Sequence, residues 1–588
     1  MMVRTLSGRH HPFEASFSPL RKLRVQLTPR EVASCLLEIR TMAARYTAPE
    51  LAGLASPVFL VFHLLFLLRV SVTFRLSDAS ATQWHNHGAN LFNTRHAPNE
   101  SLINATSVIN LKMRWKFITG FDVSATPAVY QGIVYFPSWN GNLYAVSADS
   151  GELVWMRNIT ELTGILYGDN QRGENTTLSR STPTVAGKND EMLIVSLYGP
   201  AVAIAVNRSN GDLLWQTQLD FAPSSVLTMS GTYYEGGFYI GTSSVEENFP
   251  DQCCTFQGSF LRLDAETGNI VWRTPMLPDN NGSQNLYSGA PIWGSSPSID
   301  IARNLVFIAT GNLYSVPPEI AACQEAQNNK SVKDIPDPCV EANNHEESIL
   351  ALDLDTGEIK WFHELGGYDA WVAACGRSPS PNCPVGPNPD FDFSDCPLLI
   401  TLDYGNGTKQ DVAIAADKSG YVWAVDRDTG ALVWSSVTGP GGGGGQLWGT
   451  ASDGERIFAN VPNSRHKNWT LVPGTQNITT GGWAAIKAST GEVIWSTPNP
   501  TLMPAIGPTS LANSEVVFGT SMDTNGTVFA LDARSGEILW SATTNATVFG
   551  GASISDGCIF VGCGASTNVG KGYGGTQGDS VYAFCIPH

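Results

Sequence analysis

The sequence predicts an all-β protein folded as an eight-bladed β-propeller. The first observation is an eleven-residue repeat that reads as strand, tight turn and strand and ends in tryptophan, at Trp155, Trp215, Trp272, Trp361, Trp434, Trp495 and Trp540. The second is the spacing of these tryptophans, 60, 57, 89, 73, 61 and 45 residues, which is too irregular for a stacked solenoid and suits blades with loop insertions of different length. The third is a split copy of the repeat toward the two ends of the chain, which supplies an eighth blade.

The residue types within each repeat explain a β-hairpin. In 351–361, an alternating apolar run leads into Asp-x-x-Thr-Gly, where the first aspartate can hydrogen-bond the turn backbone and the glycine accepts a positive φ. The Glu-Ile-x-Trp segment then returns as the second strand. A further strand pair that opens with proline precedes most copies, for example at 125–129 and 181–185. Each unit therefore holds about four strands, as a propeller blade does.

The eighth blade is expected to combine strands from both ends of the chain. Residues 579–584 match the strand before the turn, and Leu111–Trp115 match the returning strand. Their pairing would close the ring and remove the exposed edges that an open sheet presents to other chains. An open repeat or a seven-bladed ring is the alternative.

We expect residues 1–81 to be a leader and residues 82–588 to form the propeller. Residues 58–68 are apolar apart from His63, which is short for a membrane span and typical of a signal-peptide core. Cleavage at Ala79-Ser80-Ala81 would remove it, so no stable membrane span is expected in the mature chain. A start at Met42 would give a more ordinary signal, which makes residues 1–41 either a mispredicted extension or an organelle-type leader.

The sequon and cysteine counts also favour secretion, and the net charge bears on nucleic-acid binding. The net charge of −18 disfavours nucleic-acid binding. Twelve N-x-S/T sequons occur, and ten of the eleven cysteines follow the apolar run, an even number as a disulfide framework requires. We therefore expect a secreted glycoprotein.

The cysteines allow a partial pairing scheme. We expect disulfides between Cys323 and Cys339 and between Cys558 and Cys563, while Cys375, Cys383, Cys396 and Cys585 stay unassigned. Cys253 and Cys254 are adjacent: they either form a vicinal disulfide, a strained ring of the kind that occurs at ligand sites, or pair elsewhere. The sequence has no C-x-x-C-H motif, which excludes covalent c-type haem.

Two motifs ahead of the first blade, Trp84-x-x-x-Gly88 and Asn93-x-Arg95, complete a resemblance. With the repeats, they resemble the quinoprotein dehydrogenases, which bind pyrroloquinoline quinone (PQQ) inside an eight-bladed propeller with tryptophan-docking repeats. The similarity covers 82–588 and is closest to polyvinyl-alcohol-dehydrogenase-like members. It implies an oxidoreductase that uses PQQ and Ca²⁺, oxidises small or polymeric alcohols, and passes electrons to a separate acceptor.

The resemblance also assigns residues to a cofactor site. Glu246 and Asn312 match the metal ligands of the family, and their carboxylate and amide oxygens suit Ca²⁺. Trp293 matches the tryptophan that forms the floor under the quinone ring. Lys418 matches the basic residue at the quinone oxygens, where a cation would stabilise negative charge.

One part of the family pattern is changed in this chain. Alcohol-oxidising members carry Asp-x-Trp-Asp after the fourth repeat, with the second carboxylate as general base, but here Val372 follows Asp369-Ala370-Trp371. Asp369 is then the candidate base. Cys253 and Cys254 would bind the cofactor on the other face of its ring. The alternative to an enzyme is a non-catalytic secreted propeller that acts as a binding module or scaffold; a hydrolase would need a nucleophile constellation that the sequence does not offer.

Overall fold

The structure is a computed structural model that describes residues 82–587 except 167–176, 250–252, 295, 332–336, 340, 342, 377–379, 381, 396 and 442–447. The leader expected at 1–81 lies outside these residues. Residues 80–588 form one compact unit. In the described part of the chain, no helix combines the length and the apolar character that a membrane crossing requires.

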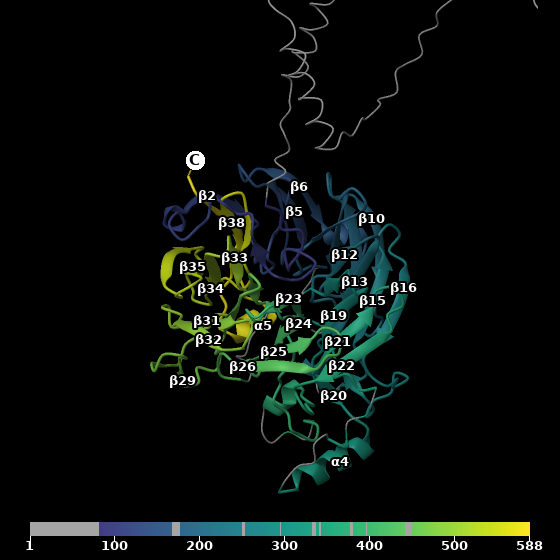
Figure 1. The fold of residues 1–588 in the computed structure, drawn as a ribbon. Helices are drawn as coiled ribbons and strands as arrows, with labels where there is room; N and C mark the ends of the chain where they lie inside the picture. The colour runs from purple at the N-terminus through teal and green to yellow at the C-terminus, as the bar shows by residue number, and fades with distance from the viewer. Residues whose placement is uncertain are drawn as a thin grey trace, which may run out of the picture. The chain divides into compact units, whose positions relative to one another are not determined.

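Eight four-stranded antiparallel sheets, one with an added fifth strand, form the blades, so the predicted eight-bladed β-propeller is confirmed (Figure 1). In chain order and from first to fourth strand the first four blades are β3 (Ala128–Tyr130), β4 (Ile133–Ser138), β5 (Asn142–Ser147), β6 (Leu153–Asn158); β7 (Thr184–Ala186), β8 (Met192–Ser196), β9 (Val202–Asn207), β10 (Leu213–Gln218); β12 (Thr232–Tyr234), β13 (Gly237–Gly241), β15 (Ser259–Asp264), β16 (Ile270–Pro275); and β18 (Ser298–Asp300), β19 (Leu305–Ala309), β21 (Ser348–Asp353), β22 (Ile359–Glu364).

Blades five to eight follow the same order. They are β23 (Leu398–Asp403), β24 (Lys409–Ala416), β25 (Tyr421–Asp426), β26 (Leu432–Val437); β27 (Ala451–Ser452), β28 (Arg456–Val461), β31 (Gly482–Lys487), β32 (Val493–Pro498); β33 (Ser510–Ala512), β34 (Val516–Thr520), β35 (Thr527–Asp532), β36 (Ile538–Thr543), with β1 (His96–Ala97) added to β33; and β37 (Ser553–Ser555), β38 (Cys558–Gly562), β39 (Ser580–Cys585), β2 (Lys112–Ile118).

Short elements lie in the connections between these strands. They are the strand pairs β11 (Ser225–Val226) with β14 (Ser243–Ser244), β17 (Ser288–Gly289) with β20 (Leu313–Ser315), and β29 (Trp469–Thr470) with β30 (Asn477–Ile478), the helices α3 (Ile159–Thr163), α4 (Pro318–Asn328) and α5 (Asn568–Gly572), and the 3₁₀ turns Val108–Asn110, Glu246–Asn248 and Ala373–Gly376.

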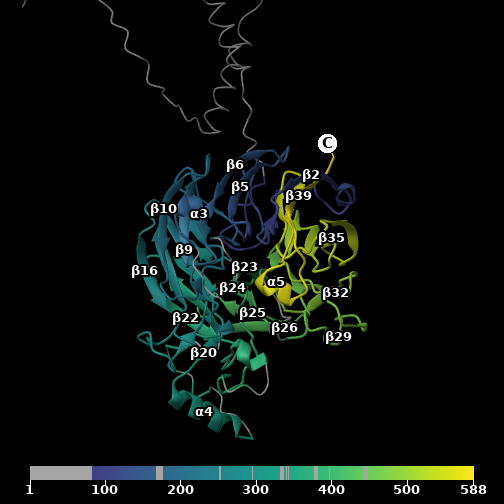
Figure 2. The same ribbon diagram turned by 180° about the vertical axis from the view of Figure 1, so that it is seen from behind.

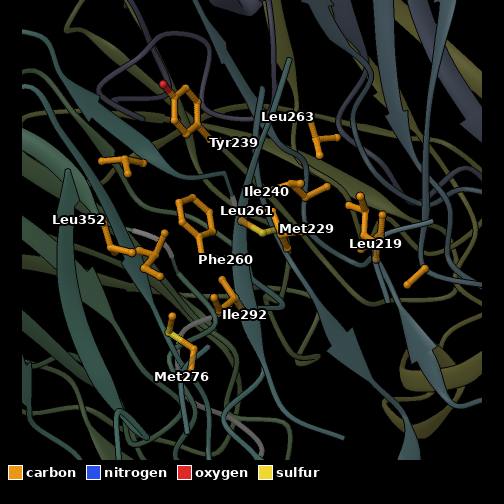
Figure 3. Packing of buried hydrophobic residues seen from close by; sticks show 14 of the residues in the cluster. Leu219, Met229, Tyr239, Ile240, Phe260, Leu261, Leu263, Met276, Ile292 and Leu352 are labelled. Carbon is orange, nitrogen blue, oxygen red and sulfur yellow. The ribbon is translucent and has the colours of Figure 1, made fainter. Parts of the chain in front are cut away.

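The core lies between neighbouring sheets. Every residue of β8 is buried, whereas β6, the fourth strand of its blade, exposes Leu153, Val154 and Met156. Figure 3 shows the packing around the third blade, where Phe260 lies on the face toward Leu352 of the fourth blade and Ile240 lies on the opposite face, beside Leu261. Strands covered on both faces are expected to be nearly continuous in apolar residues, as β8 and β19 are.

Each repeat tryptophan fastens its blade to the next one. Trp155 Nε1 donates a hydrogen bond to the Arg208 carbonyl in the following blade, and its ring lies against Gly211, which has a φ of +75°. The bond recurs around the ring with N···O distances of 2.8 to 3.2 Å, from Trp115 to Ala148, Trp155 to Arg208, Trp215 to Ala265, Trp272 to Leu354, Trp361 to Arg427, Trp434 to Ala488, Trp495 to Ala533 and Trp540 to Leu111. The turn glycine of the repeat thus serves both the turn and the docking of the indole.

The eighth sheet combines β2, from the first part of the described chain, with the last three strands. β2 pairs antiparallel with β39, and Trp115 lies opposite Ala583 (Figures 1 and 2). A disulfide between Cys558 and Cys585 joins β38 to β39.

The expected pairing of Cys558 with Cys563 is wrong. Cys558 begins β38 and Cys563 directly follows it; an extended chain rises about 3.3 Å per residue, which separates them too far for a disulfide. Cys585 instead faces Cys558 across the sheet, with a Cα–Cα distance of 4.0 Å, and Cys563 is a buried free thiol.

The other described cysteines form three disulfides. The expected pair Cys323–Cys339 is confirmed, and Cys375 pairs with Cys383. Cys253 and Cys254 are joined to each other.

The segment 82–95 crosses the first strands of most blades. Its backbone hydrogen bonds, 2.7 to 2.9 Å long, join Trp84 to Val129, His85 to Val185, Leu91 to Ile299, Phe92 to Leu399, Thr94 to Ser452 and Arg95 to Leu511. The Arg95 side chain is buried and donates to the Thr509 carbonyl at 2.6 Å. The two motifs that precede the repeats therefore tie the blades together.

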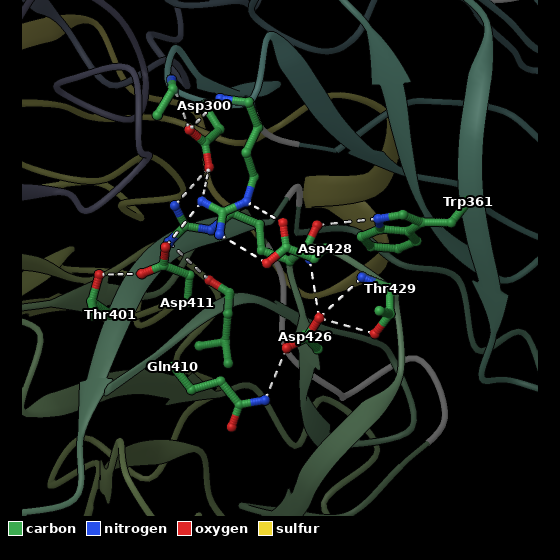
Figure 4. A network of polar contacts seen from close by, with 12 residues as sticks. Asp300, Trp361, Thr401, Gln410, Asp411, Asp426, Asp428 and Thr429 are labelled. Carbon is green, nitrogen blue, oxygen red and sulfur yellow. Dashed lines mark hydrogen bonds and ion pairs between the residues drawn. The ribbon is translucent and has the colours of Figure 1, made fainter. Parts of the chain in front are cut away.

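An ion-pair network joins the fourth and fifth blades (Figure 4). Asp300 accepts from Arg303 and Arg427, both at 2.9 Å, and Arg303 also pairs with Asp411 and Asp428. Burial acts to raise the pKa of Asp300, but the hydrogen bonds from the two arginines hold it below its ordinary value. Asp300 is therefore ionised in the folded protein.

Candidate functional site

A cavity of about 540 Å³ opens among the loops at one end of the blades. Its walls come from two kinds of connection: those between the second and third strands of a blade, and those between one blade and the next. The lining residues are Arg180, Tyr198, Thr228, Ser243, Ser244, Val245, Glu247, Asn248, Phe249, Pro291, Trp293, Asn312, Tyr314, Trp371, Asp390, Asp392, Lys418, Trp448 and Tyr573. This volume lies within the range of small-molecule and cofactor sites.

Aromatic rings and two cations form one part of the wall. Trp293 meets Trp448 edge to face, with ring centroids 5.2 Å apart. The Lys418 ammonium lies 5.0 Å from the Trp293 centroid, and the Arg180 guanidinium lies 4.9 Å from that of Trp448. Both indole N–H groups are buried and have no hydrogen-bond partner among the described residues. A flat ligand could stack on the face of such a ring.

Lys418 bridges two carboxylates at the same cavity. Its Nζ lies 2.6 Å from Asp390 Oδ1 and 2.7 Å from Asp392 Oδ2. Burial raises the pKa of Asp390 to about 6, although Lys418 acts to lower it. These attractions hold the pKa of Lys418 well above its ordinary value against the effect of burial.

Asn312 and Glu247 offer oxygen atoms to the cavity. The Asn312 Nδ2 donates to the Leu313 and Trp371 carbonyls at 2.6 and 2.8 Å, which leaves Oδ1 as the oxygen available to a ligand. Burial raises the pKa of Glu247 to about 7, while a hydrogen bond from Tyr314 acts to lower it. Glu247 Oε2 has no hydrogen-bond partner among the described residues.

Three of the seven expected site residues line this cavity: Trp293, Asn312 and Lys418. Glu246 does not; its carboxylate accepts from the backbone N–H groups of Thr255 and Phe256, at 2.8 to 3.0 Å. It thereby fixes the segment that follows the joined Cys253 and Cys254.

The cysteine pair also lies behind the cavity wall. Cys254 is buried with Phe256, Tyr314 and Val372, and Cys253 packs against the same group. The expected cover over a cofactor ring is therefore not part of the lining.

Asp369 lies beneath the cavity rather than in its wall. Its Oδ2 accepts from the Phe391 backbone N–H at 2.8 Å, and Phe391 separates Asp390 from Asp392. The Asp369 carbonyl accepts from the N–H of Leu313, next to Asn312, at 2.9 Å. Asp369 thus positions the residues that face the cavity.

Sequence reasoning missed Asp390, Asp392, Glu247 and Tyr573. Asp390 and Asp392 lie on either side of Phe391 in an irregular segment where Asp390 has a φ of +63°, so no strand alternation marked them. For Tyr573, which follows α5 in a glycine-rich loop of the eighth blade, no such signal exists either. Figures 1 and 2 both place α5 beside the strands of the fifth blade, which carries Lys418.

Fold and cavity together define an eight-bladed propeller with a candidate site that combines a stacking surface, a cation between carboxylates, and oxygen donors. Residues 84–440 match the family described as the glucose/ethanol/alcohol dehydrogenase β-propeller domain of the PQQ proteins, and the chain belongs to this family. Residues 418–554 also match the family of the outer membrane protein assembly factor BamB.

Similar proteins include two polyvinylalcohol dehydrogenases. The protein from Pseudomonas sp. is 28% identical over 71% of this chain and 60% of its own length; that from Sphingopyxis sp. (strain 113P3) is 26% identical over 71% and 59%. The chain thus spans about 60% of the length of these relatives. The crystal structure of quinohemoprotein alcohol dehydrogenase from Comamonas testosteroni shares the fold, with a TM-score of 0.63, 18% identity, and coverage of 88% of this chain and 82% of the other.

Proposed function

We propose that this protein is a PQQ-dependent oxidoreductase that oxidises alcohol groups in the described cavity. The observation that carries the proposal is the Lys418 ammonium, which bridges Asp390 and Asp392 within 5.0 Å of the Trp293 ring centre. A stacking surface, a fixed cation and a basic carboxylate are the groups that oxidation of a hydroxyl by a flat quinone requires.

The residues present fit the quinone. Trp293 offers a flat face, and Lys418 places a cation beside that face. PQQ bound here would supply the two-electron acceptor that no protein side chain provides.

The oxygen donors fit a divalent cation of the hard type, and we propose Ca²⁺. Glu247 Oε2 and Asn312 Oδ1 would be its protein ligands, in place of the expected Glu246. Among the described residues, no three His, Cys, Asp or Glu side chains are grouped to hold a metal ion, so further oxygens would come from the ligand or from water.

Asp390 is the proposed base. It lies in the cavity wall, and a carboxylate with a pKa of about 6 is ionised at neutral pH yet basic enough to take a hydroxyl proton. Lys418 orients it and stabilises negative charge on the substrate oxygen. Asp369 acts through the Phe391 N–H, as a positioning residue.

The substrate and the cell compartment are further proposals. The names of the two relatives from Pseudomonas sp. and Sphingopyxis sp. favour a secondary or polymeric alcohol.

We propose a separate electron acceptor, removal of the leader near Ala81, and secretion as a glycoprotein. Exposed sequon asparagines such as Asn281, Asn406 and Asn525 support this, and N-terminal sequencing with glycan mapping of the secreted form would test it.

A dye-coupled assay tests the activity. Purified protein is loaded with PQQ and CaCl₂ and supplied with a secondary alcohol and an artificial electron acceptor. Asp390→Asn should lower kcat by about 10²-fold or more, as expected when a general base is lost. The control is Asp403→Asn, an exposed acid at the end of β23, which should leave kcat unchanged. Parent protein that binds quinone but reduces no dye with any alcohol would refute the proposed activity.

A further inference from the structure

Two consecutive glutamates are fully buried beneath the cavity. Glu346 and Glu347 immediately precede β21, and both have an exposed fraction of 0%. Neither carboxylate oxygen of Glu347 has a hydrogen-bond partner in the described chain, and the same holds for Glu346 Oε2 and for Oδ1 of the buried Asp369. Buried acids are normally paired, so these unsatisfied oxygens need an explanation.

The backbone holds Glu347 in this position. Its N–H donates to the Gly311 carbonyl and its carbonyl accepts from Leu365, although its φ of +43° is rare for a residue with a long side chain. Gly366 closes over it so tightly that a Cβ there would lie 2.8 Å from the Glu347 Cβ. These contacts hold Glu347 inside the protein, where it is fully buried.

The charges around Glu347 are mostly negative. Its neighbours on the surrounding segments are Asp392, Asp369, Asp417 and the adjacent Glu346. Two cations act on the neighbouring Asp390: Lys418, which is already paired with Asp390 and Asp392, and Arg465.

Ionisation of every acid would leave several buried negative charges uncompensated, which a protein interior does not tolerate. Burial, and then Asp392 and Asp369, raise the pKa of Glu347 well above its ordinary value, and burial raises that of Asp369 to about 8.

We propose that Glu346, Glu347 and Asp369 form a proton-binding site beneath the cavity, whose carboxyl groups stay protonated at neutral pH. The site keeps Asp390 and Asp392 as the anions that Lys418 balances. It also responds to the cavity: positive charge that enters there favours release of a proton, and lost positive charge favours uptake. The proposal does not depend on a quinone being the cofactor.

Infrared spectroscopy of the full chain is the first test. A protonated carboxyl group absorbs above the amide I band, and the parent protein should show this absorption at neutral pH, with a shift in D₂O. Glu347→Gln should remove part of it. The matched control is Glu319→Gln, the same change at an exposed acid on α4, which should leave the band as it is.

Stability against pH is the second test. A carboxyl group whose folded pKa is raised above its unfolded value destabilises the folded state as pH rises through the interval between the two values. Glutamine cannot ionise, so the denaturation midpoint of Glu347→Gln should rise relative to the parent between acid and neutral pH. Glu319→Gln should show no such trend.

Three results would overturn the proposal. One is a parent spectrum without the protonated-carboxyl band at neutral pH, which decides the matter even if Glu347→Gln fails to fold. Another is a band unchanged in both Glu347→Gln and Glu346→Gln. The third is a divalent cation that survives dialysis, seen by elemental analysis, and is lost in Glu347→Gln, because a metal and not protons would then neutralise the acids. Failure to bind quinone would leave these results unaffected.

Discussion

Replacement of Lys418 by methionine should destabilise the protein by leaving two buried carboxylates without their cation. The side chains of Lys418, Asp390 and Asp392 are 13%, 12% and 7% exposed, so solvent screens these ion pairs little. Loss of one partner from a buried ion pair costs about 3–5 kcal/mol, and methionine keeps most of the contact with Trp293. With an unfolding entropy of about 2.1 cal/mol/K per residue over roughly 500 residues, this corresponds to a Tm lower by about 3–5 °C.

The loss should depend on pH in a defined direction. Without Lys418, burial raises the folded pKa of Asp390 further above its unfolded value, so the folded variant takes up a proton as pH falls. The stability gap between Lys418→Met and the parent should therefore be largest near about pH 8 and narrow toward about pH 5. Differential scanning calorimetry at both pH values measures this stability gap.

The control is Lys409→Met, which replaces an exposed lysine in β24 and should change stability by less than about 1 kcal/mol. A Lys418→Met variant as stable as the parent at the higher pH, or a gap that does not narrow, would refute the reasoning.

Two further predictions concern the contacts between blades. Gly430→Ala should lower the free energy of unfolding by about 1–3 kcal/mol more than Gly405→Ala does. Both glycines have a positive φ, +72° and +75°, but only at Gly430 would an added Cβ meet the Trp361 ring, at 2.5 Å. Equal losses in thermal unfolding would contradict the docking role of the indole. Asp300→Asn should lower stability at neutral pH, and its stability should converge with that of the parent below about pH 4. Burial acts to raise the pKa of Asp300, but arginine hydrogen bonds such as that from Arg427 outweigh it and lower the pKa. A carboxylate with a lowered pKa stabilises the fold only while it is ionised. A difference that persists in acid would argue against the ion-pair network.

The fold was readable from the sequence because its signals are local and repeated. A hairpin of alternating residues with Asp-x-x-Thr/Ser-Gly at the turn needs no tertiary information, and eight near-copies imply a ring. The role of the segment 82–95 was not readable, because its backbone hydrogen bonds reach residues as distant as Leu511. The disulfide error has a similar origin: closeness in sequence favoured Cys563, whereas sheet register places Cys585 opposite Cys558.

The candidate site was predicted only in part. Lys418 lies in the short connection from β24 to β25, Asn312 directly precedes β20, and Trp293 lies between β17 and β18, so family motifs next to strands located these residues. Glu246 and Glu247 differ by one position, and only the local turn, a 3₁₀ turn from Glu246 to Asn248, decides which carboxylate faces the cavity. The cavity carboxylates Asp390 and Asp392 lie on a long insertion whose path no local pattern gives.

The central claim, that the cavity binds PQQ, is tested most directly by a spectroscopic titration of the purified chain with PQQ, with and without CaCl₂. We predict saturable, stoichiometric binding that requires the cation. Trp293→Ala should weaken it by about 1 kcal/mol or more, the contribution of an aromatic stacking pair, and Glu247→Gln should shift the calcium dependence to higher concentration. The matched control is Trp434→Ala, a docking tryptophan that does not line the cavity, which should leave the affinity of the folded protein unchanged. The assignment of this cavity would be contradicted by a parent protein that binds no PQQ at any calcium concentration. It would also be contradicted by a Trp293→Ala variant that binds PQQ as tightly as the parent.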